Sequence, residues 1–298
     1  MDDEAFVDEE ILVDVCAGIV MTDLESDTSI IRLVHYTTQQ YFERNRATIF
    51  PNAQAQISRT CLRYLSLEEF SLGHEIRSPF FSYAATNWGV HVAHSPEKEV
   101  SNELNQFFGL THNLHRSIND IFRGVLYESL PLNSLDSSLW LASFFGLAQV
   151  AQTLVLEGAD VNVKIWASRP EVSYSAIRNA CHIGNVQIFK HLLENGAIID
   201  DIGENQMTLL AFAALMGHLE LVQMLVDKDC DIHAPDPVYG SVLQAAIFGQ
   251  SVETCRYLID RGSDVEFWRA PRGTSLGLAV ARRIEVCMSI LQSLKLIS

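Results

Sequence analysis

The chain has 298 residues, of which 48% are hydrophobic and 19% charged, and its formal net charge is -16 at pH 7. This length suits one large or two ordinary domains with a substantial core, and the hydrophobic fraction excludes wholesale disorder. No apolar run approaches the roughly 20 residues of a membrane span. The acidic excess disfavours binding to nucleic acid or to an anionic membrane surface. We therefore expect a cytoplasmic protein, with a nuclear location as the alternative.

The cysteines are scattered along the chain, and no two of them have CxxC spacing. This distribution is typical of a reduced intracellular protein and not of a disulfide framework or a zinc site. We expect neither a metal ion nor a cofactor. The six cysteines are Cys16, Cys61, Cys181, Cys230, Cys255 and Cys287.

The chain begins with an acidic run at residues 1–10, MDDEAFVDEE, which is unlike a secretory signal. We expect this tail to be solvated and disordered, with docking to a basic partner as the alternative. Residues 11–95 are predicted to form a partial winged-helix-like region followed by further helices, and residues 96–136 a helical connector. Residues 137–298 contain a repeat.

Within 11–95, the pattern predicts a short helix at 11–17, two strands at 19–23 and 30–35, and then a further helix. Thr37 or Thr38 is expected to cap that helix. Two more helices are predicted at 57–70 and 80–94. The order of helix, hairpin and helix is similar to a winged helix.

The repeat is evident in four segments that end alike: LVLEGADVN (154–162), HLLENGAIID (191–200), MLVDKDCDIH (224–233) and YLIDRGSDVE (257–266). Gly158, Gly196, Asp229 and Gly262 are equivalent positions, at spacings of 38, 33 and 33 residues. An Ala-rich apolar stretch precedes each segment, and a fifth copy begins at Ser275. A period of this length predicts stacked supersecondary units.

Each unit is predicted to form two helices and a turn. In the second helix, apolar residues recur at i, i+3 and i+4, which gives one stripe to bury. The glycines follow this helix, where a left-handed C-cap favours glycine. Three apolar columns run across the units: Leu154, Leu192, Leu225, Leu258 and Ile290; Val155, Leu193, Val226, Ile259 and Leu291; and Ala151, Phe189, Val222, Cys255 and Cys287.

These units resemble ankyrin repeats, most closely in MTLLAFAALMGHLELVQMLVDKDCDIH (207–233), where Leu209 replaces the usual proline and Asp229-Cys230 replaces Gly-Ala. The resemblance covers 137–298 and implies four to five repeats, the last of them degenerate. The expected fold class is mostly α: an ankyrin-repeat solenoid preceded by a partial winged-helix-like region and a helical connector.

The first half resembles one region of fungal NACHT–ankyrin proteins, which are NLR-like. The residues that carry this resemblance are CAGIV (16–20), RLVHYTTQQYFER (32–44), CLRYLS (61–66) and FSYAATNWGVHV (81–92). It implies a nucleotide-binding module upstream of that region. None of the five lysines follows a glycine, so the chain carries no P-loop. We therefore expect a shortened member or a fragment of that family, without the ATPase.

Other signals of chemistry have simpler explanations. The stretch 273–277 matches the G-x-S-x-G nucleophile elbow, which leaves a serine hydrolase using Ser275 as a remote alternative. The context favours Thr274 as a helix cap. Two histidine pairs, His91/His94 and His112/His115, have i, i+3 spacing but lack further zinc ligands nearby, so packing or surface roles are favoured.

The most favoured function is noncatalytic binding of another protein, with no small-molecule substrate. The ankyrin resemblance implies binding through the turn tips and the concave face; the tips are 163–174, 201–206, 234–240 and 267–273. Trp, Tyr and Arg dominate interface hot spots, and the candidates are Trp166, Arg169, Tyr174, Tyr239, Trp268, Arg269 and Arg272. Alternatively, Trp166 and Trp268 fold back onto a neighbouring repeat. A second hypothesis is an auxiliary subunit that modulates a full-length NACHT ATPase homologue.

Overall fold

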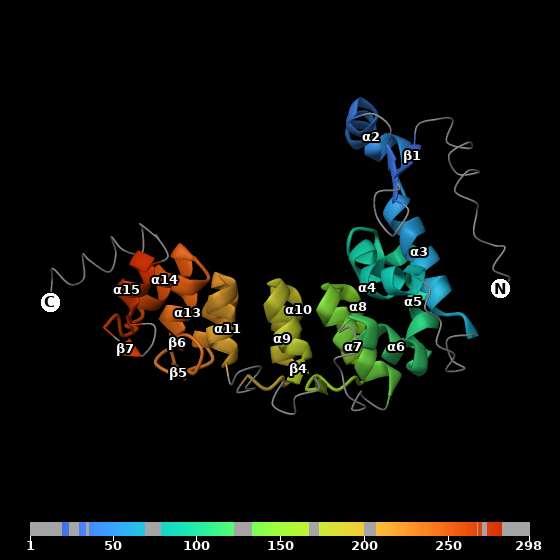
Figure 1. The fold of residues 1–298 in the computed structure, drawn as a ribbon. Helices are drawn as coiled ribbons and strands as arrows, with labels where there is room; N and C mark the ends of the chain where they lie inside the picture. Colours follow the sequence, from blue (N-terminus) through green and yellow to red (C-terminus); the bar gives the residue numbers. More distant parts are fainter. Residues whose placement is uncertain are drawn as a thin grey trace. The chain divides into compact units, whose positions relative to one another are not determined.

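A computed structural model describes residues 20–23, 30–33, 36–68, 79–121, 133–166, 173–199, 207–266, 268–269 and 273–281. The chain divides into two compact units, 1–53 and 54–298. Figure 1 traces the helices and strands of each unit in chain order.

The first unit contains an antiparallel hairpin and a helix. Strands β1 (Val20–Asp23) and β2 (Ile30–Leu33) pair with Val20 opposite Leu33, which confirms the two predicted strands. Helix α2 (Tyr36–Ile49) follows. The predicted cap at Thr37 or Thr38 is wrong, because the helix begins before them and both threonines lie in its first turn. The predicted helix at 11–17 falls outside the described residues, and the winged-helix-like identity of the region stays a prediction.

The second unit opens with helices that precede the repeats. They are α3 (Ala53–Leu65), α4 (Pro79–Ala93), the short 3-10 helix η3 (Glu97–Glu99), α5 (Ser101–Phe108) and α6 (Thr111–Ile121). The two helices predicted at 57–70 and 80–94 are confirmed, although α3 begins and ends earlier than predicted. The mostly helical character of the connector is confirmed over its described residues.

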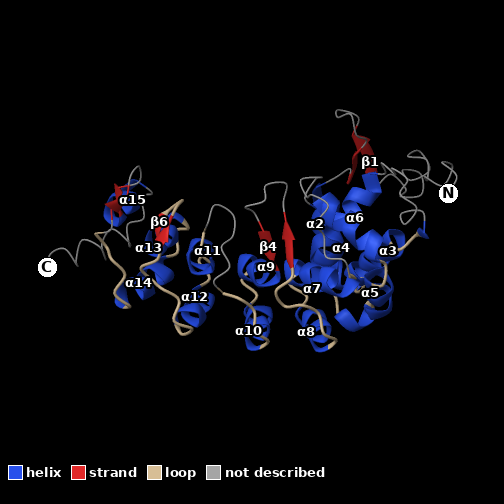
Figure 2. Ribbon diagram, turned by 90° about the horizontal axis from the view of Figure 1, so that it is seen from below, coloured by secondary structure: helices blue, strands red, loops and turns tan. Residues whose placement is uncertain are grey.

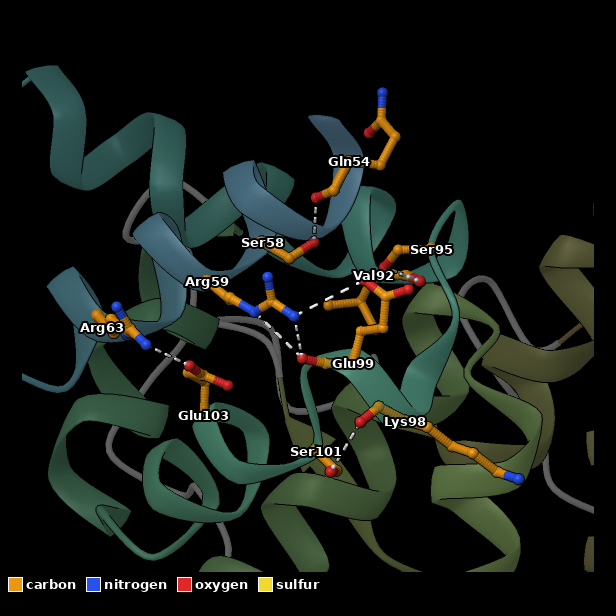
Figure 3. A network of polar contacts seen from close by, with 10 residues as sticks. All are labelled: Gln54, Ser58, Arg59, Arg63, Val92, Ser95, Lys98, Glu99, Ser101 and Glu103. Carbon is orange, nitrogen blue, oxygen red and sulfur yellow. Dashed lines mark hydrogen bonds and ion pairs between the residues drawn. The ribbon is translucent and has the colours of Figure 1, made fainter. Parts of the chain in front are cut away.

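Two arginine side chains of α3 contact glutamate residues of η3 and α5 (Figure 3). Arg59 donates from Nε and Nη2 to the carbonyl of Glu99, at 3.1 and 2.7 Å, and its Nη2 lies 3.7 Å from the Glu99 carboxylate. One turn later, Arg63 pairs with Glu103 at 2.8 Å. Because both contacts span 40 residues of sequence, they fix α3 on the connector and not merely within its own helix.

The repeats follow as pairs of helices in two rows (Figure 2). The first helices are α7 (Ser134–Phe145), α9 (Ala176–Ile183), α11 (Leu209–Met216), α13 (Val242–Phe248) and α15 (Ser275–Ala281). The second helices are α8 (Ala148–Leu156), α10 (Val186–Glu194), α12 (Leu219–Val226) and α14 (Val252–Asp260). Each first helix from α7 to α13 packs on its own second helix and on the next first helix.

Three short antiparallel hairpins join successive helix pairs. They are β3 (Lys164–Trp166) with β4 (Ser173–Ser175), β5 (Pro235–Asp236) with β6 (Gly240–Ser241), and β7 (Trp268–Arg269) with β8 (Gly273–Thr274). The second strand of each hairpin is followed directly by the first helix of the next repeat. Each hairpin therefore places its tip close to the start of that helix. The tip predicted at 201–206 lies outside the described residues.

The core confirms the predicted columns of the second helices. Every described member of two columns is buried: Leu154, Leu192, Leu225, Leu258, Ala151, Phe189, Val222 and Cys255. The described members of the third column are partly buried and pack against the core: Val155, Leu193, Val226 and Ile259. Gly158, Gly196, Asp229 and Gly262 all have positive φ after the second helix, as the left-handed C-cap requires. Asp229 reaches φ 61° without being a glycine.

The first helix of the fourth repeat ends differently from the others. The residue in left-handed conformation is Gln250, at φ 63°, one residue after Gly249. Gly217 occupies the equivalent position in the third repeat, 33 residues earlier. Gly249 is required for another reason, because a Cβ there would lie 1.9 Å from the Leu215 carbonyl oxygen. In the first three repeats the position equivalent to Gly249 carries a side chain (Phe145, Ile183 and Met216), so this close backbone approach occurs at the fourth repeat.

The helices that precede the repeats share one core with them. Phe145, at the end of α7, lies edge-on to Trp88 of α4 with ring centroids 4.9 Å apart. A Cβ on Gly89 would lie 2.1 Å from the Phe145 ring, so that ring packs directly on the α4 backbone. Helices α4, α5 and α6 all pack on α7. Packing therefore continues across residues 136–137, where the sequence predicts a domain boundary. The division of the chain into a connector and a repeat domain at that point stays a prediction.

Candidate functional site

The hairpins hold the predicted binding residues of the first and fourth tips. Trp166 ends β3 opposite Ser173, and Tyr174 pairs with Ile165 across the hairpin. The Tyr174 side chain is half-buried, and its carbonyl accepts a 2.8 Å hydrogen bond from Trp140 Nε1 of α7. Trp268 and Arg269 together form β7 and lie opposite Thr274 and Gly273. The candidates Arg169 and Arg272 fall outside the described residues.

Tyr239 lies in the turn between β5 and β6. Its backbone N–H and that of Val238 donate to Asp236 Oδ1, which closes the turn around a buried carboxylate. The half-buried Tyr239 ring packs on Phe248 of α13, with centroids 4.8 Å apart. This predicted contact residue therefore joins a hairpin to the row of first helices.

The first helices carry a row of partly exposed, mostly apolar side chains, and the ring of Tyr239 packs on one of them, Phe248. Phe144, Leu215 and Phe248 occupy equivalent positions in three repeats and are half-buried, and His182 fills the same position in the second repeat and is exposed. The His182 ring stacks on Phe212 of the next repeat, with centroids 6.0 Å apart and planes inclined by 11°. One ring contact thus links the row between the second and third repeats.

One residue further along, Ile183 is 42% exposed and its equivalent Met216 is half-buried. We call these residues the first-helix edge: Phe144, His182, Ile183, Phe212, Leu215, Met216 and Phe248.

Charge is scarce along this row. The helices α7, α9, α11 and α13 contain only two residues of the Asp, Glu, Lys and Arg types, Asp136 and Arg178. Arg178 is 6% exposed, donates from Nη2 to the Met207 carbonyl at 3.0 Å, and lies over the Phe212 ring at 5.2 Å. Asp136 lies in the first turn of α7, where Asn133 caps the helix. The exposed part of the edge therefore offers apolar surface and one histidine.

The sequence-based prediction named the concave face of the first helices but assigned candidate residues only to the turn tips, so the residues of the first-helix edge were missed. The repeat register contains the missing signal: positions 144, 182, 215 and 248 are equivalent, and three of them are large apolar residues. Large apolar side chains that recur on a helix face with partial exposure indicate an interaction surface.

The candidate serine nucleophile is inaccessible. Ser275 is 0% exposed at the start of α15, and Thr274 Oγ1 accepts a hydrogen bond from Gly277 N at 3.2 Å. This bond confirms that Thr274 caps the helix. A hydroxyl without solvent access cannot attack a substrate in this conformation.

The histidine pairs make separate hydrogen bonds. His91 Nδ1 lies 2.7 Å from Gln54 Oε1, and its Nε2 lies 2.8 Å from the Tyr83 hydroxyl. His94 bonds the Val90 carbonyl, and His115 contacts Ser137. Within the described part of the chain, no group of three His, Cys, Asp or Glu residues is placed to hold a metal ion.

The buried cysteines behave as core residues. Burial raises the pKa of the Cys61 thiol to about 11 and that of Cys181 to about 12. Cys255 is fully buried in the second-helix column, as predicted, and Cys287 lies outside the described residues. Thiols with such high pKa values are protonated at neutral pH and are poor nucleophiles.

The second-helix row has hollows of its own. One of about 270 Å³ lies between α5 and α8, and another of about 230 Å³ lies between α8 and α10. Leu156 of α8 is 76% exposed. This row is the alternative face for a partner.

Comparison with known proteins identifies the repeats. Residues 139–236 match the family model of ankyrin repeats, in three copies. This match confirms the ankyrin repeats and, with the helical architecture, the mostly α fold. Among the described residues, every helix is too short or too polar to traverse a lipid bilayer.

Three curated relatives share part of the sequence. Mouse "Ankyrin repeat and SAM domain-containing protein 6" is 35% identical over 107 residues, which are 35% of this chain and 11% of the relative. "Ankyrin repeat domain-containing protein SAT10" from Stachybotrys chartarum is 27% identical over 139 residues, 47% of this chain and 7% of the relative. Zebrafish "Putative palmitoyltransferase ZDHHC13" is 29% identical over 153 residues, 50% of this chain and 23% of the relative. The chain therefore spans under a quarter of each of these relatives.

Proposed function

We propose that this chain is a noncatalytic module that binds another protein through its hairpin tips and the adjoining first-helix edge. Ankyrin repeats indicate protein–protein interaction. The observation that carries the proposal is the continuity of two features: hairpins that bear Trp and Tyr, and a row of partly exposed apolar side chains on the helices they lead into. Tyr239 packed on Phe248 joins the two features physically.

The absence of catalysis is also a proposal, supported by the state of the reactive groups that the structure describes. Ser275 is buried, and the raised pKa values of Cys61 and Cys181 keep their thiols protonated. The modulation of a full-length NACHT ATPase homologue rests on the resemblance of residues 11–95 alone, and we place it second.

The proposal is tested by quantitative affinity capture from a cell extract, with the full chain immobilised. Replacing both tryptophans, Trp166→Ala with Trp268→Ala, is expected to reduce recovery of specific partners at least tenfold, as loss of hot-spot residues does. Leu156→Ala is the matched control, because it removes an exposed apolar side chain from the second-helix row. Unchanged recovery with the double variant would count against the tips, and loss with Leu156→Ala would move the site to the other row.

A further inference from the structure

We infer that the ligand of the first-helix edge is an amphipathic α-helix with an apolar stripe, supplied by a partner protein. The inference rests on the proposed function and specifies the partner that this surface fits.

The chemistry of the edge selects a ligand that satisfies its own backbone. Six of its seven side chains have no N–H or O–H group, and His182 is the exception. The backbone of the first helices is engaged in intrahelical hydrogen bonds. An extended peptide laid across the edge would therefore bury N–H and C=O groups without partners, at about 1–3 kcal/mol each. A helix carries its backbone hydrogen bonds with it.

Strand addition to the hairpins is a weaker alternative. The strands β3 and β4 have three residues each, and β5, β6, β7 and β8 have two each. Such edges offer too few ladder bonds to hold a peptide by main-chain pairing alone.

The spacing of the repeats also suits a helix. Packed helices lie roughly 8–10 Å apart, and a helix returns a side chain to the same face every seven residues, or about 10.5 Å. Ligand side chains at i and i+7 can therefore meet successive first helices, and those at i+3 or i+4 lie on the same face of the ligand. A ligand helix of about 20 residues would cross all four helices from α7 to α13.

The scarcity of charge on the first-helix row determines which residue types the apolar stripe of the ligand should contain. The only formal charges on the row are Asp136, at the helix start, and the buried Arg178. Leucine, methionine or phenylalanine on the ligand would bury apolar area against this edge. A charged stripe would lose hydration without gaining a partner.

The test uses three synthetic peptides of about 21 residues, binding to the full chain measured by fluorescence anisotropy. The first has leucines at i, i+3, i+4 and i+7 among equal numbers of Glu and Lys, so that its net charge is zero. The second is a scrambled isomer without a stripe. The third carries two central prolines, which prevent helix formation. We expect the striped peptide to bind at least about tenfold more tightly than either of the others.

Variants of the chain locate the site. Ile183→Glu and Met216→Glu, both on the first-helix edge, are expected to weaken the striped peptide at least about tenfold. Leu156→Glu is the matched control on the second-helix row and is expected to change affinity less than about twofold. Circular dichroism melting of each variant verifies that the fold is retained, and Ile183 is exposed enough to accept a charge.

Equal binding of the proline or scrambled peptide would overturn the inference, and so would a larger effect of Leu156→Glu than of Ile183→Glu. If captured partners depend on Trp166 and Trp268 but the striped peptide does not bind, the proposed function stands and the helical ligand is rejected. If neither partners nor peptide bind, both proposals fail.

Discussion

Arg178 of α9 donates a 3.0 Å hydrogen bond to the carbonyl of Met207, the residue before the N-cap Thr208 of the next first helix. Trp140 of α7 makes the equivalent bond to Tyr174, at 2.8 Å. In each case a first helix holds the residue just before the following first helix or its cap. These bonds therefore fix the position of one first helix relative to the next, on which the proposed binding surface depends.

Replacing Arg178 with methionine, Arg178→Met, is expected to lower the free energy of unfolding by about 1.5–3 kcal/mol. The change keeps a long side chain but removes the donor, so the Met207 carbonyl loses a bond from a charged group. Urea denaturation measures the effect. Lys190→Met is the control: Lys190 is exposed, its contact with Glu194 is 3.9 Å, and its loss should cost below about 0.5 kcal/mol. Equal stability of the two variants would show that the inter-repeat bond contributes little.

The end of α13 predicts opposite effects for two adjacent substitutions. Gln250→Gly should stabilise the chain by about 0.5–1 kcal/mol, because it relieves a side chain at φ 63°. Gly249→Ala should destabilise it by about 2 kcal/mol or more, because the new Cβ would overlap the Leu215 carbonyl oxygen. Thermal unfolding followed by circular dichroism distinguishes the two. A stabilising Gly249→Ala would contradict the close approach of the Leu215 carbonyl oxygen, and a destabilising Gln250→Gly would contradict the left-handed conformation of Gln250.

The core shared by α4 and the repeats is tested at Gly89. Gly89→Ala places a methyl group 2.1 Å from the Phe145 ring and should cost about 1–3 kcal/mol through overpacking. The double variant Gly89→Ala with Phe145→Leu should recover part of this loss, because the smaller side chain makes room. A Gly89→Ala protein that melts like the wild type would indicate that α4 and α7 do not pack closely.

The hydrogen bonds of His91 predict a pH dependence. Burial, with nearby His94 as the second cause, lowers the pKa of His91, and the Tyr83 hydroxyl bond suits the neutral ring. The unfolded chain then binds more protons than the folded chain between the ordinary histidine pKa of about 6.5 and the lowered value. The contribution of His91 to the free energy of unfolding is therefore constant above a pH of about 6.5. It is lost as the pH falls from that value to the lowered pKa of His91. An NMR titration that places the His91 pKa above 6.5 would contradict this account.

The repeat could be predicted from sequence because the same local requirement recurs every 33 residues. The buried second-helix column and the left-handed position of Asp229 follow from that register. The left-handed conformation of Gln250 could not be predicted, since the sequence places a glycine one residue earlier, at Gly249, where that conformation would be expected. The close approach of the Leu215 carbonyl oxygen is the reason for glycine at position 249.

Long-range packing accounts for the remaining differences. The contact of Gly89 with Phe145 joins residues far apart in the chain, and no local sequence pattern predicts it. The first-helix edge needed both the register and the exposure of each side chain, of which sequence supplies only the first. The start of α2 before Thr37 shows that a good capping residue does not guarantee a cap.

The central claim is that a partner binds the hairpins and the first-helix edge. Hydrogen exchange by mass spectrometry, on the full chain with and without a captured partner, tests it most directly. We predict that the partner slows exchange in 163–174, 234–240 and 267–273 and in α9 and α11, while α8, α10 and α12 are unchanged. Protection confined to α8, α10 and α12 would contradict the account and assign binding to the second-helix row.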